Sequence, residues 1–188
     1  SVTHYKTMSC IDTYVFDSGV KKFEIDRKQA LQFARCPVAD EQTELLCSRC
    51  VNEVEAAANY KAVVKIYDIA VGESEVDFGF IKMQSRSLAK FLCGYKQVAI
   101  FAATAGIGID RLINKYSRIA PSKSLMISAV GSSAIECFCD TITEKFGPKN
   151  RRFSPGYGDL DLKYQPLILN ELSALKHTGI TLLENLMM

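Results

Sequence analysis

The sequence predicts an α+β fold: a single domain over residues 1–188, with a central, mainly antiparallel sheet flanked by helices and an N-terminal arm over about residues 1–25. The hydrophobic periodicity changes irregularly between helical and strand spacing, one pair of strands has the form of a hairpin, and no βαβ unit is repeated. This combination favours α+β over a doubly wound sheet. A chain of 188 residues, 48% of them hydrophobic, is long enough to bury one core.

Composition excludes several classes of function. A net charge of +2 falls well short of the basic excess expected of a nucleic-acid binder. The longest apolar stretch, Val98–Ile109, is too short to span a bilayer and is broken by Gly106 and Gly108. Ser1–Cys10 contains no apolar core of an export signal. We therefore expect a cytoplasmic protein that binds neither nucleic acid nor membrane.

Seven cysteines, an odd number in a chain without a secretory signal, favour a reducing compartment and free thiols. Cys47 and Cys50 can share one face of a predicted helix, whereas Cys137 and Cys139 point in diverging directions. A closed zinc site needs four ligands, and both histidines are poorly placed to complete one. We expect buried or idle thiols and no metal.

The N-terminal part is predicted to contain an extended segment and two helices. The extended segment lies around Thr13–Phe16. Asp26 precedes a run of good helix formers and can cap a helix that ends before Pro37. The second helix begins near Asp40 and continues to about Asn59. Its apolar residues recur at helical spacing and are Leu45, Leu46, Cys50, Val54 and Ala57.

From Tyr60 the hydrophobic period changes to two, which is typical of strands. One strand is predicted over residues 64–69 and another over Val76–Phe80. They are joined through Val71–Ser74, a short segment with glycine at its second position, so an antiparallel hairpin is expected.

A short helix and a third strand follow. Ser85 or Ser87 can cap the helix by accepting a hydrogen bond from its first turn, and Gly94 ends it. Gln97–Thr104 is predicted as a strand that is apolar enough to be central in the sheet.

A Gly-x-Gly pattern lies in Thr104–Asp110, between this strand and a predicted helix. Gly-x-Gly in such a position can hold a phosphate on backbone N–H groups. The full Gly-x-Gly-x-x-Gly fingerprint is missing, and a tight strand-to-helix turn explains both glycines as well. The phosphate site and the plain turn both stay open on this pattern.

A long helix is predicted over Ser122–Phe146, opened by Pro121 and stopped by Gly147 and Pro148. Glu136 lies away from the apolar stripe, among small and polar residues, so it is either plain surface or part of a place where a small ligand docks. The apolar stripe comprises Ile127, Val130, Ala134, Phe138 and Thr141.

Pro166 suits the first position of a further helix, which Gly179 ends. Lys176 and His177 fall in its last turn, where positive charge complements the negative helix end. Ile180–Met188 is then predicted as a strand. The buried stripe of the helix is expected to be Ile168, Leu172 and Leu175.

Between these two helices, Arg151–Tyr157 reads Arg-Arg-Phe-Ser-Pro-Gly-Tyr and combines groups that bind ligands. A guanidinium offers a planar fork to a carboxylate or phosphate, Ser154 supplies a hydroxyl, and Tyr157 supplies a phenol. Pro155 fixes φ, and Gly156 lets another molecule approach the backbone. The alternative is an ordinary solvent-facing turn, which Pro-Gly signals by itself.

The segment Arg152–Tyr157, followed by Leu172–Glu184, resembles the C-terminal activation domain of cobalamin-dependent methionine synthase. In that family an Arg-x-x-x-Gly-Tyr pattern binds S-adenosylmethionine, and a Lys-His-Thr-Gly helix end leads into a core strand. The pattern falls on Arg152, Gly156 and Tyr157, and the glutamate of the preceding long helix falls on Glu136. Upstream, Phe101–Asp110 is similar to free-standing, single-domain members from bacteria whose methionine synthase lacks its own activation domain.

The resemblance implies an S-adenosylmethionine site formed by Glu136, Arg152, Ser154, Gly156 and Tyr157, with no catalytic residue and no metal. Arg152 would take the ligand carboxylate, and Glu136 would complement a cation or the ribose. The domain would present the methyl donor to a cobalamin carried by a partner, a methionine synthase or related corrinoid protein, after one-electron reduction by a flavodoxin-type or other donor. Alone, it would bind without turnover.

Two other hypotheses remain. One is a non-catalytic interaction module for a corrinoid protein, with a degenerate pocket. The other is an autonomous S-adenosylmethionine-dependent methyltransferase that uses the Thr104–Asp110 turn. The aspartate ligand of the family is not matched to a particular residue, and Asp26 is a guess. Members continue with a further strand, so part of the pocket wall is expected to be missing or supplied by a partner.

Overall fold

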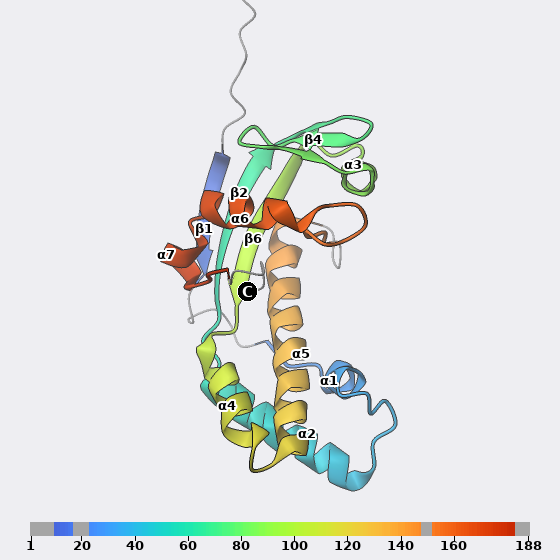
Figure 1. Cartoon of the computed structure of the whole chain (residues 1–188), viewed down its shortest axis with the longest axis vertical. Coiled ribbons are helices and arrows are strands. Elements are labelled where there is room, and N and C mark those ends of the chain that lie inside the picture. The colour runs from blue at the N-terminus through green and yellow to red at the C-terminus, as the bar shows by residue number, and fades with distance from the viewer. Residues whose placement is uncertain (1–9, 17–22, 148–151, 183–188) are drawn as a thin grey trace, which may run out of the picture. The chain divides into compact units, whose positions relative to one another are not determined.

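The computed structural model describes residues 10–16, 23–147 and 152–182. The α+β prediction is confirmed: antiparallel sheets are flanked by helices (Figure 1). The chain divides into two compact units, each assembled from separate segments. Unit 1 comprises Ser1–Val15, Ala62–Ala102 and Arg151–Met188, and unit 2 comprises Phe16–Lys61 and Ala103–Asn150. The expectation of a single domain over the whole chain stays a prediction.

The larger sheet of unit 1 has the strand order β1-β2-β6, with β1 at Cys10–Phe16, β2 at Lys61–Asp68 and β6 at Gln97–Thr104. The predicted extended segment is therefore a strand, while the rest of the N-terminal arm lies mostly outside the described residues. Val63 and Val64 of β2 are fully buried. This burial agrees with the central position of β2 between the other two strands.

The prediction that Gln97–Thr104 is central in the sheet is wrong, because β6 stands at one end of the described strand order. The apolar residues of β6 are covered by the helical segment around Leu172 and Ala174, and not by a further strand on its other side. Ala102 belongs to a buried cluster with Val63, Leu172 and Ala174, and Ile100 packs against that cluster. Hydrophobicity alone could not separate these two ways of covering a strand.

The smaller sheet of unit 1 is antiparallel, with β3 at Ala70–Val71, β4 at Glu75–Asp77 and β5 at Lys82–Gln84. Gly72 donates its N–H to the Glu75 carbonyl at 2.9 Å and closes the first turn. A hairpin therefore forms at the predicted turn, but its first strand is β3; the strand predicted over residues 64–69 is β2, which lies in the larger sheet and not in this hairpin. Its second strand is shorter than predicted, because the chain turns after β4 and Phe78 donates its N–H to the Ile81 carbonyl at 2.9 Å.

A short helix, α3 at Arg86–Leu92, follows β5. Ser85 is its N-cap, and its side chain accepts a hydrogen bond from the Leu88 N–H at 2.9 Å. Of the two serines proposed as caps, the structure selects Ser85, which is itself buried.

The C-terminal part of unit 1 contains a 3₁₀ turn, η1 at Leu162–Tyr164, and two short helices, α6 at Gln165–Glu171 and α7 at Ala174–Thr178. A single helix was expected here. Ser173 adopts a left-handed conformation with φ of 50° and breaks it, so Leu175 is exposed and not buried as predicted.

Gly179, with φ of 79°, ends α7 as expected. The predicted strand over Ile180–Met188 is not seen at residues 180–182, which have no regular secondary structure. Its remaining residues, 183–188, lie outside the described residues.

Unit 2 consists of helices: α1 at Arg27–Phe33, α2 at Glu41–Ala57, α4 at Ile107–Ser117 and α5 at Pro121–Phe146. The predicted cap Asp26 is confirmed, since it accepts from the Gln29 N–H at 3.1 Å. Asp40, near which the second helix was predicted to begin, caps α2 by accepting from the Thr43 N–H at 2.8 Å. Capping α1 is therefore a sufficient structural role for Asp26, which needs no ligand to explain it.

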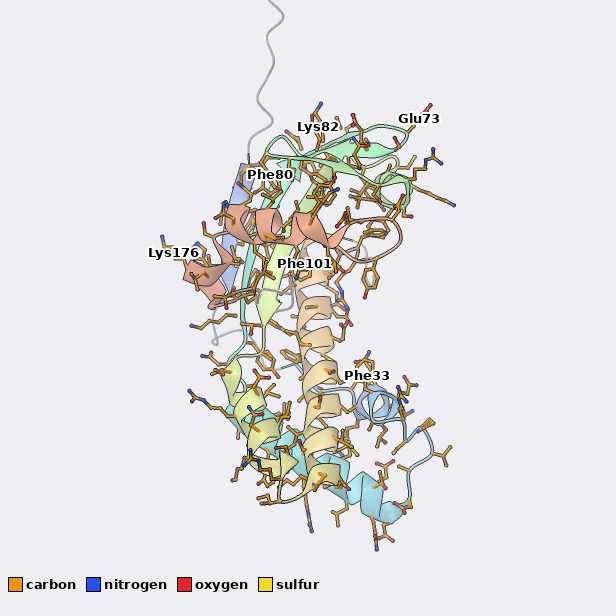
Figure 2. The ribbon with its side chains drawn as sticks, in the orientation of Figure 1. Phe33, Glu73, Phe80, Lys82, Phe101 and Lys176 are labelled. Atoms are coloured by element: carbon orange, nitrogen blue, oxygen red, sulfur yellow. The ribbon has the colours of Figure 1, made fainter. Side chains whose placement is uncertain are left out.

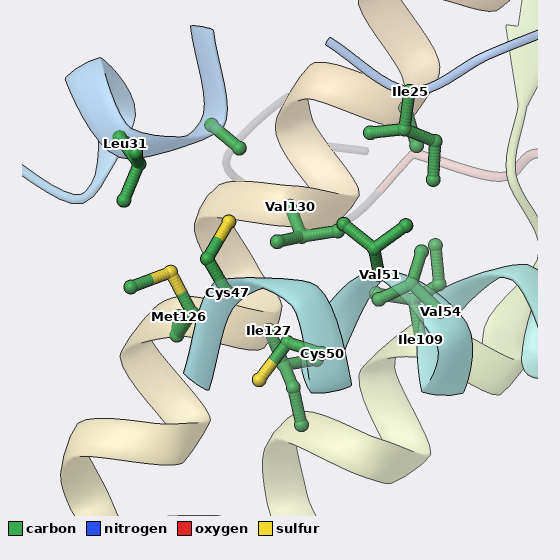
Figure 3. Packing of buried hydrophobic residues seen from close by; sticks show 12 residues of the cluster. Ile25, Leu31, Cys47, Cys50, Val51, Val54, Ile109, Met126, Ile127 and Val130 are labelled. Carbon is green, nitrogen blue, oxygen red and sulfur yellow. The ribbon is translucent and has the colours of Figure 1, made fainter. Parts of the chain in front are cut away.

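The core of unit 2 is built around α5, against which α1, α2 and α4 pack. In Figure 3, Ile127 and Val130 of α5 face Val51 and Val54 of α2, and Ile109 of α4 joins them. Each of these side chains is nearly or fully buried. The apolar stripe predicted for the long helix therefore serves as the centre of this core, except that Thr141 is only partly buried.

Among the described helices, α5 is long and apolar enough, by length and composition, to cross a membrane, with a mean hydropathy of 1.4 over its most apolar window. Half of that window is buried inside the structure. The core helix of a soluble protein meets the same criterion, and packing within unit 2 accounts for the apolar residues of α5.

Candidate functional site

The loop that precedes η1 begins with a tight turn at Ser154–Tyr157. Tyr157 donates its N–H to the Ser154 carbonyl at 3.1 Å. Pro155 occupies the second position of the turn, and Gly156 occupies the third with φ of 94°. A positive φ at the third position, after proline, is the signature of a type II turn. The Pro-Gly pair thus has a local structural role, and the turn hypothesis is confirmed alongside any binding role.

A second turn follows directly and closes the loop. Leu160 donates its N–H to the Tyr157 carbonyl at 3.0 Å, and Gly156 donates its N–H to the Leu160 carbonyl at 2.8 Å. Gly158 lies inside this turn with φ of 57°. A Cβ atom at Gly158 would lie 2.7 Å from the side chain of Ser87, so only glycine allows the loop to approach α3 this closely.

Two apolar side chains anchor the loop in the core of unit 1. Leu160 is 4% exposed and belongs to a buried cluster with Leu88 of α3. Phe153 packs against the same cluster, with its ring centroid 5.2 Å from that of Phe91. The ends of the loop are therefore fixed by burial, while its tip is left in solvent.

Asp159 provides a polar anchor between these apolar ones. Its carboxylate accepts hydrogen bonds from the Ser85 hydroxyl at 2.5 Å, the Arg86 N–H at 2.9 Å and the Ser87 N–H at 3.1 Å. The Ser85 hydrogen bond, followed by that from the Ser87 N–H, holds the pKa of Asp159 well below its usual range. Asp159 is thus an anion held at the first turn of α3.

The tip presents the groups that the sequence singled out. Ser154 and Gly156 are exposed, Tyr157 is 62% exposed, and Arg152 is partly buried. The Tyr157 ring lies edge-on to Phe153 at 6.3 Å, which limits where the phenol can point. Arg152, Ser154, Gly156 and Tyr157 are thus brought together on one anchored loop of unit 1.

The other sequence-predicted residues are placed elsewhere. Glu136 lies on α5 in unit 2 and is partly buried, so its joint site with the loop stays a prediction. Arg151, expected as a solvent-facing or partner-facing cation, lies outside the described residues.

The Gly-x-Gly turn has a structural explanation within unit 2. A Cβ atom on Gly108 would lie 2.1 Å from the Ala57 carbonyl oxygen, and one on Gly106 would lie 3.0 Å from the Asn59 carbonyl oxygen. Gly106 also has φ of 82°. The backbone at the end of α2 thus explains both glycines by close packing, and the Gly106 N–H is already donated to Thr104 Oγ1 at 3.0 Å, which favours the plain turn.

The thiols form no evident site. All seven cysteines lie among the described residues and are free, and Cys47 and Cys50 are buried in the core of unit 2. Burial raises the pKa of Cys50 to about 11, which makes this thiol unreactive. Within the described part of the chain, no group of three or more His, Cys, Asp or Glu residues could hold a metal ion.

A shallow hollow of about 420 Å³ lies on α6 and α7, away from the loop, and is lined by residues that include Asn170, Ser173 and Lys176. Lys176 projects outward from α7 (Figure 2). None of the predicted ligand residues lines it, and its wide opening gives little enclosure for a small molecule.

Asp159 and Gly158 were missed by the sequence analysis. The Gly-Asp pair directly after Gly156-Tyr157 was the available signal, since aspartate and glycine mark turns. The role of Asp159 as an anchor depends on contacts with Ser85–Ser87, which lie more than 70 positions earlier in the chain. No local sequence pattern indicates these contacts.

No protein-family model and no curated protein matches the sequence. Among solved structures, the chain is similar to a crystal structure of the MetH reactivation domain bound to AdoHcy, with a TM-score of 0.66 over 96% of this chain and 75% of that one. Only 15% of the residues are identical, so the similarity shows the fold alone. It is the fold that the resemblance to the methionine synthase activation domain implied.

Proposed function

We propose that this protein is an S-adenosylmethionine-binding domain of the reactivation type. Two independent observations support the proposal. The fold is similar to that of a reactivation domain whose structure contains AdoHcy. The residues of the Arg-x-x-x-Gly-Tyr pattern lie together on one loop that is anchored at both ends and exposed at its tip.

The conformation of the loop is the observation that carries the proposal. A solvent-facing turn without a function does not need Phe153, Leu160 and Asp159 to fix it in place. Such anchoring reduces the entropy lost when a ligand binds. The exposed tip then offers the Ser154 hydroxyl and the Tyr157 phenol in a defined arrangement, with the Arg152 guanidinium next to the Phe153 anchor.

These groups match the chemistry of S-adenosylmethionine. The Arg152 guanidinium would bind the ligand carboxylate through two parallel hydrogen bonds. Gly156 would let the backbone approach the ligand, and Tyr157 would stack against it or donate a hydrogen bond from its hydroxyl. Glu136 would complement the ammonium group or the ribose.

The biological role that fits such a site is to present a methyl donor. In this role the protein would hold S-adenosylmethionine against a cobalamin carried by a methionine synthase or another corrinoid protein in the cytoplasm. A flavodoxin-type or other donor would first reduce the cobalamin by one electron. Catalysis would rest on proximity and orientation, and would need no acid, base or nucleophile from this chain.

Titration calorimetry with S-adenosylmethionine tests the proposed site. We expect Arg152→Ala to weaken binding about 10- to 100-fold, because a hydrogen bond to a charged group contributes about 1.5–3 kcal/mol. Arg111→Ala, which removes an exposed arginine from α4 in unit 2, is the matched control and should bind like the wild type.

Unchanged, tight binding by Arg152→Ala would overturn the assigned site. Absence of saturable binding to the wild type would favour the interaction module with a degenerate pocket. Loss of binding in Gly106→Val together with normal binding in Arg152→Ala would favour a methyltransferase that uses the Thr104–Asp110 turn, a result that the filled space beside Gly108 makes unexpected.

A further inference from the structure

We infer that Asp159 is the positioning residue of the ligand loop: it fastens the loop to the start of α3 and thereby orients Tyr157 toward the ligand. The inference rests on the proposed function for the identity of the ligand. The fastening itself is a property of the free protein.

All three hydrogen bonds that Asp159 accepts come from residues 85–87, at the start of α3. Both carboxylate oxygens are used, Oδ1 by the Ser85 hydroxyl and the Ser87 N–H, and Oδ2 by the Arg86 N–H. A carboxylate that accepts from two backbone groups and a hydroxyl is fixed in position and in rotation. Ser85 is 3% exposed, so the partner of Asp159 is held by the core.

The position of Asp159 within the loop lets it control the tip. Only Gly158 separates it from Tyr157, and Gly158 is held against Ser87 with no room for a side chain. The hydrogen bond from Gly156 to Leu160 spans Asp159 and closes the loop around it. Without the carboxylate, the hydrogen bonds that tie this part of the loop to the start of α3 would be lost, so the tip would lose its fixed direction although Phe153 and Leu160 stay buried.

The chain contains no tryptophan, so Tyr157→Trp places a single tryptophan at the loop tip, and its emission can be excited selectively over that of tyrosine. In this background without ligand, we expect Asp159→Asn to lower the steady-state anisotropy of Trp emission and to increase its quenching by acrylamide. Asp161→Asn is the matched control: Asp161 is an exposed carboxylate on the same loop that accepts from the Lys163 N–H at 2.9 Å in η1, and its loss should leave both signals unchanged.

In the native Tyr157 background, we expect Asp159→Asn to raise the Kd for AdoHcy about fivefold to tenfold, with an unchanged circular dichroism spectrum. Unchanged anisotropy and unchanged Kd would overturn the positioning role. Should Asp159→Asn fail to fold, Asp159→Glu keeps the charge on a longer side chain and is expected to change both signals in the same direction by less; no change there would equally overturn the role. If the wild type does not bind AdoHcy, the proposed function fails, while the anisotropy still decides whether Asp159 fixes the tip.

Discussion

Two buried tyrosine hydroxyls differ in whether they have a partner. Tyr67 of β2 is 2% exposed and donates a hydrogen bond to Glu171 Oε1 at 2.7 Å. The Tyr60 ring packs on Phe23 and Phe138 at 4.8 and 5.2 Å, and its buried hydroxyl has no partner among the described residues. Burial, and then the Glu55 charge, raise the pKa of Tyr60 to about 12.

These environments give opposite expectations for the same substitution. Tyr60→Phe should raise the free energy of unfolding by about 1 kcal/mol, because it removes an unsatisfied polar atom and keeps the aromatic packing. Tyr67→Phe should lower it by about 1–2 kcal/mol, because it removes a hydrogen bond to a charged group. Urea unfolding followed by circular dichroism measures both; a loss for Tyr60→Phe as large as that for Tyr67→Phe would contradict this explanation.

Among single residues, sequence reasoning predicted those that act through local geometry. Asp26, and Ser85 as one of two candidates, were expected as helix caps, and each accepts the expected hydrogen bond. Asp159 was not predicted, because its partners lie far away in the chain. The hydrogen bond from Tyr67 to Glu171 was missed for the same reason.

The contact of α2 with α4 explains a glycine pattern that otherwise points to nucleotide binding. Gly108 is in the first turn of α4, where the Ala57 carbonyl oxygen at the end of α2 takes the place of a side chain. Asn59 donates its N–H to the Ala105 carbonyl at 2.8 Å and holds the two segments together. The close approach of these two helices therefore depends on a residue without a Cβ atom.

We expect Gly108→Ala to lower the free energy of unfolding by about 1–3 kcal/mol, because the new methyl group would overlap backbone that must shift. This loss should exceed the gain of about 1 kcal/mol that alanine brings to a helix interior. Thermal unfolding measures the change. Gly147→Ala is the control, since a Cβ atom there meets nothing within 4 Å; equal stability of the two variants would argue against the packing explanation.

Helices and strands with a clear period were predicted to within a few residues, and breaks within them were not. The long helix α5 and strand β6 begin and end close to their predicted positions. The break between α6 and α7 depends on the left-handed conformation of Ser173, which no local residue pattern indicated. The order of strands in the sheet depends on long-range packing, so the position of β6 was also mistaken.

For the molecule as a whole, the proposed ligand residues come from both compact units. The loop belongs to unit 1, whereas Glu136 belongs to unit 2, and only the resemblance to the activation domain joined them. Sequence reasoning therefore predicted the members of the loop from a local pattern, while the assignment of Glu136 to the same ligand stays a prediction.

Binding of AdoHcy and S-adenosylmethionine at the anchored loop is tested most directly by amide chemical shifts. In a titration of the uniformly ¹⁵N-labelled protein with AdoHcy, we expect saturable shifts for the amides of residues 153–160, where only Pro155 lacks one. Amides of residues 105–110 should stay in place. Saturable shifts confined to residues 105–110, or no saturable shift at all, would contradict binding at the anchored loop.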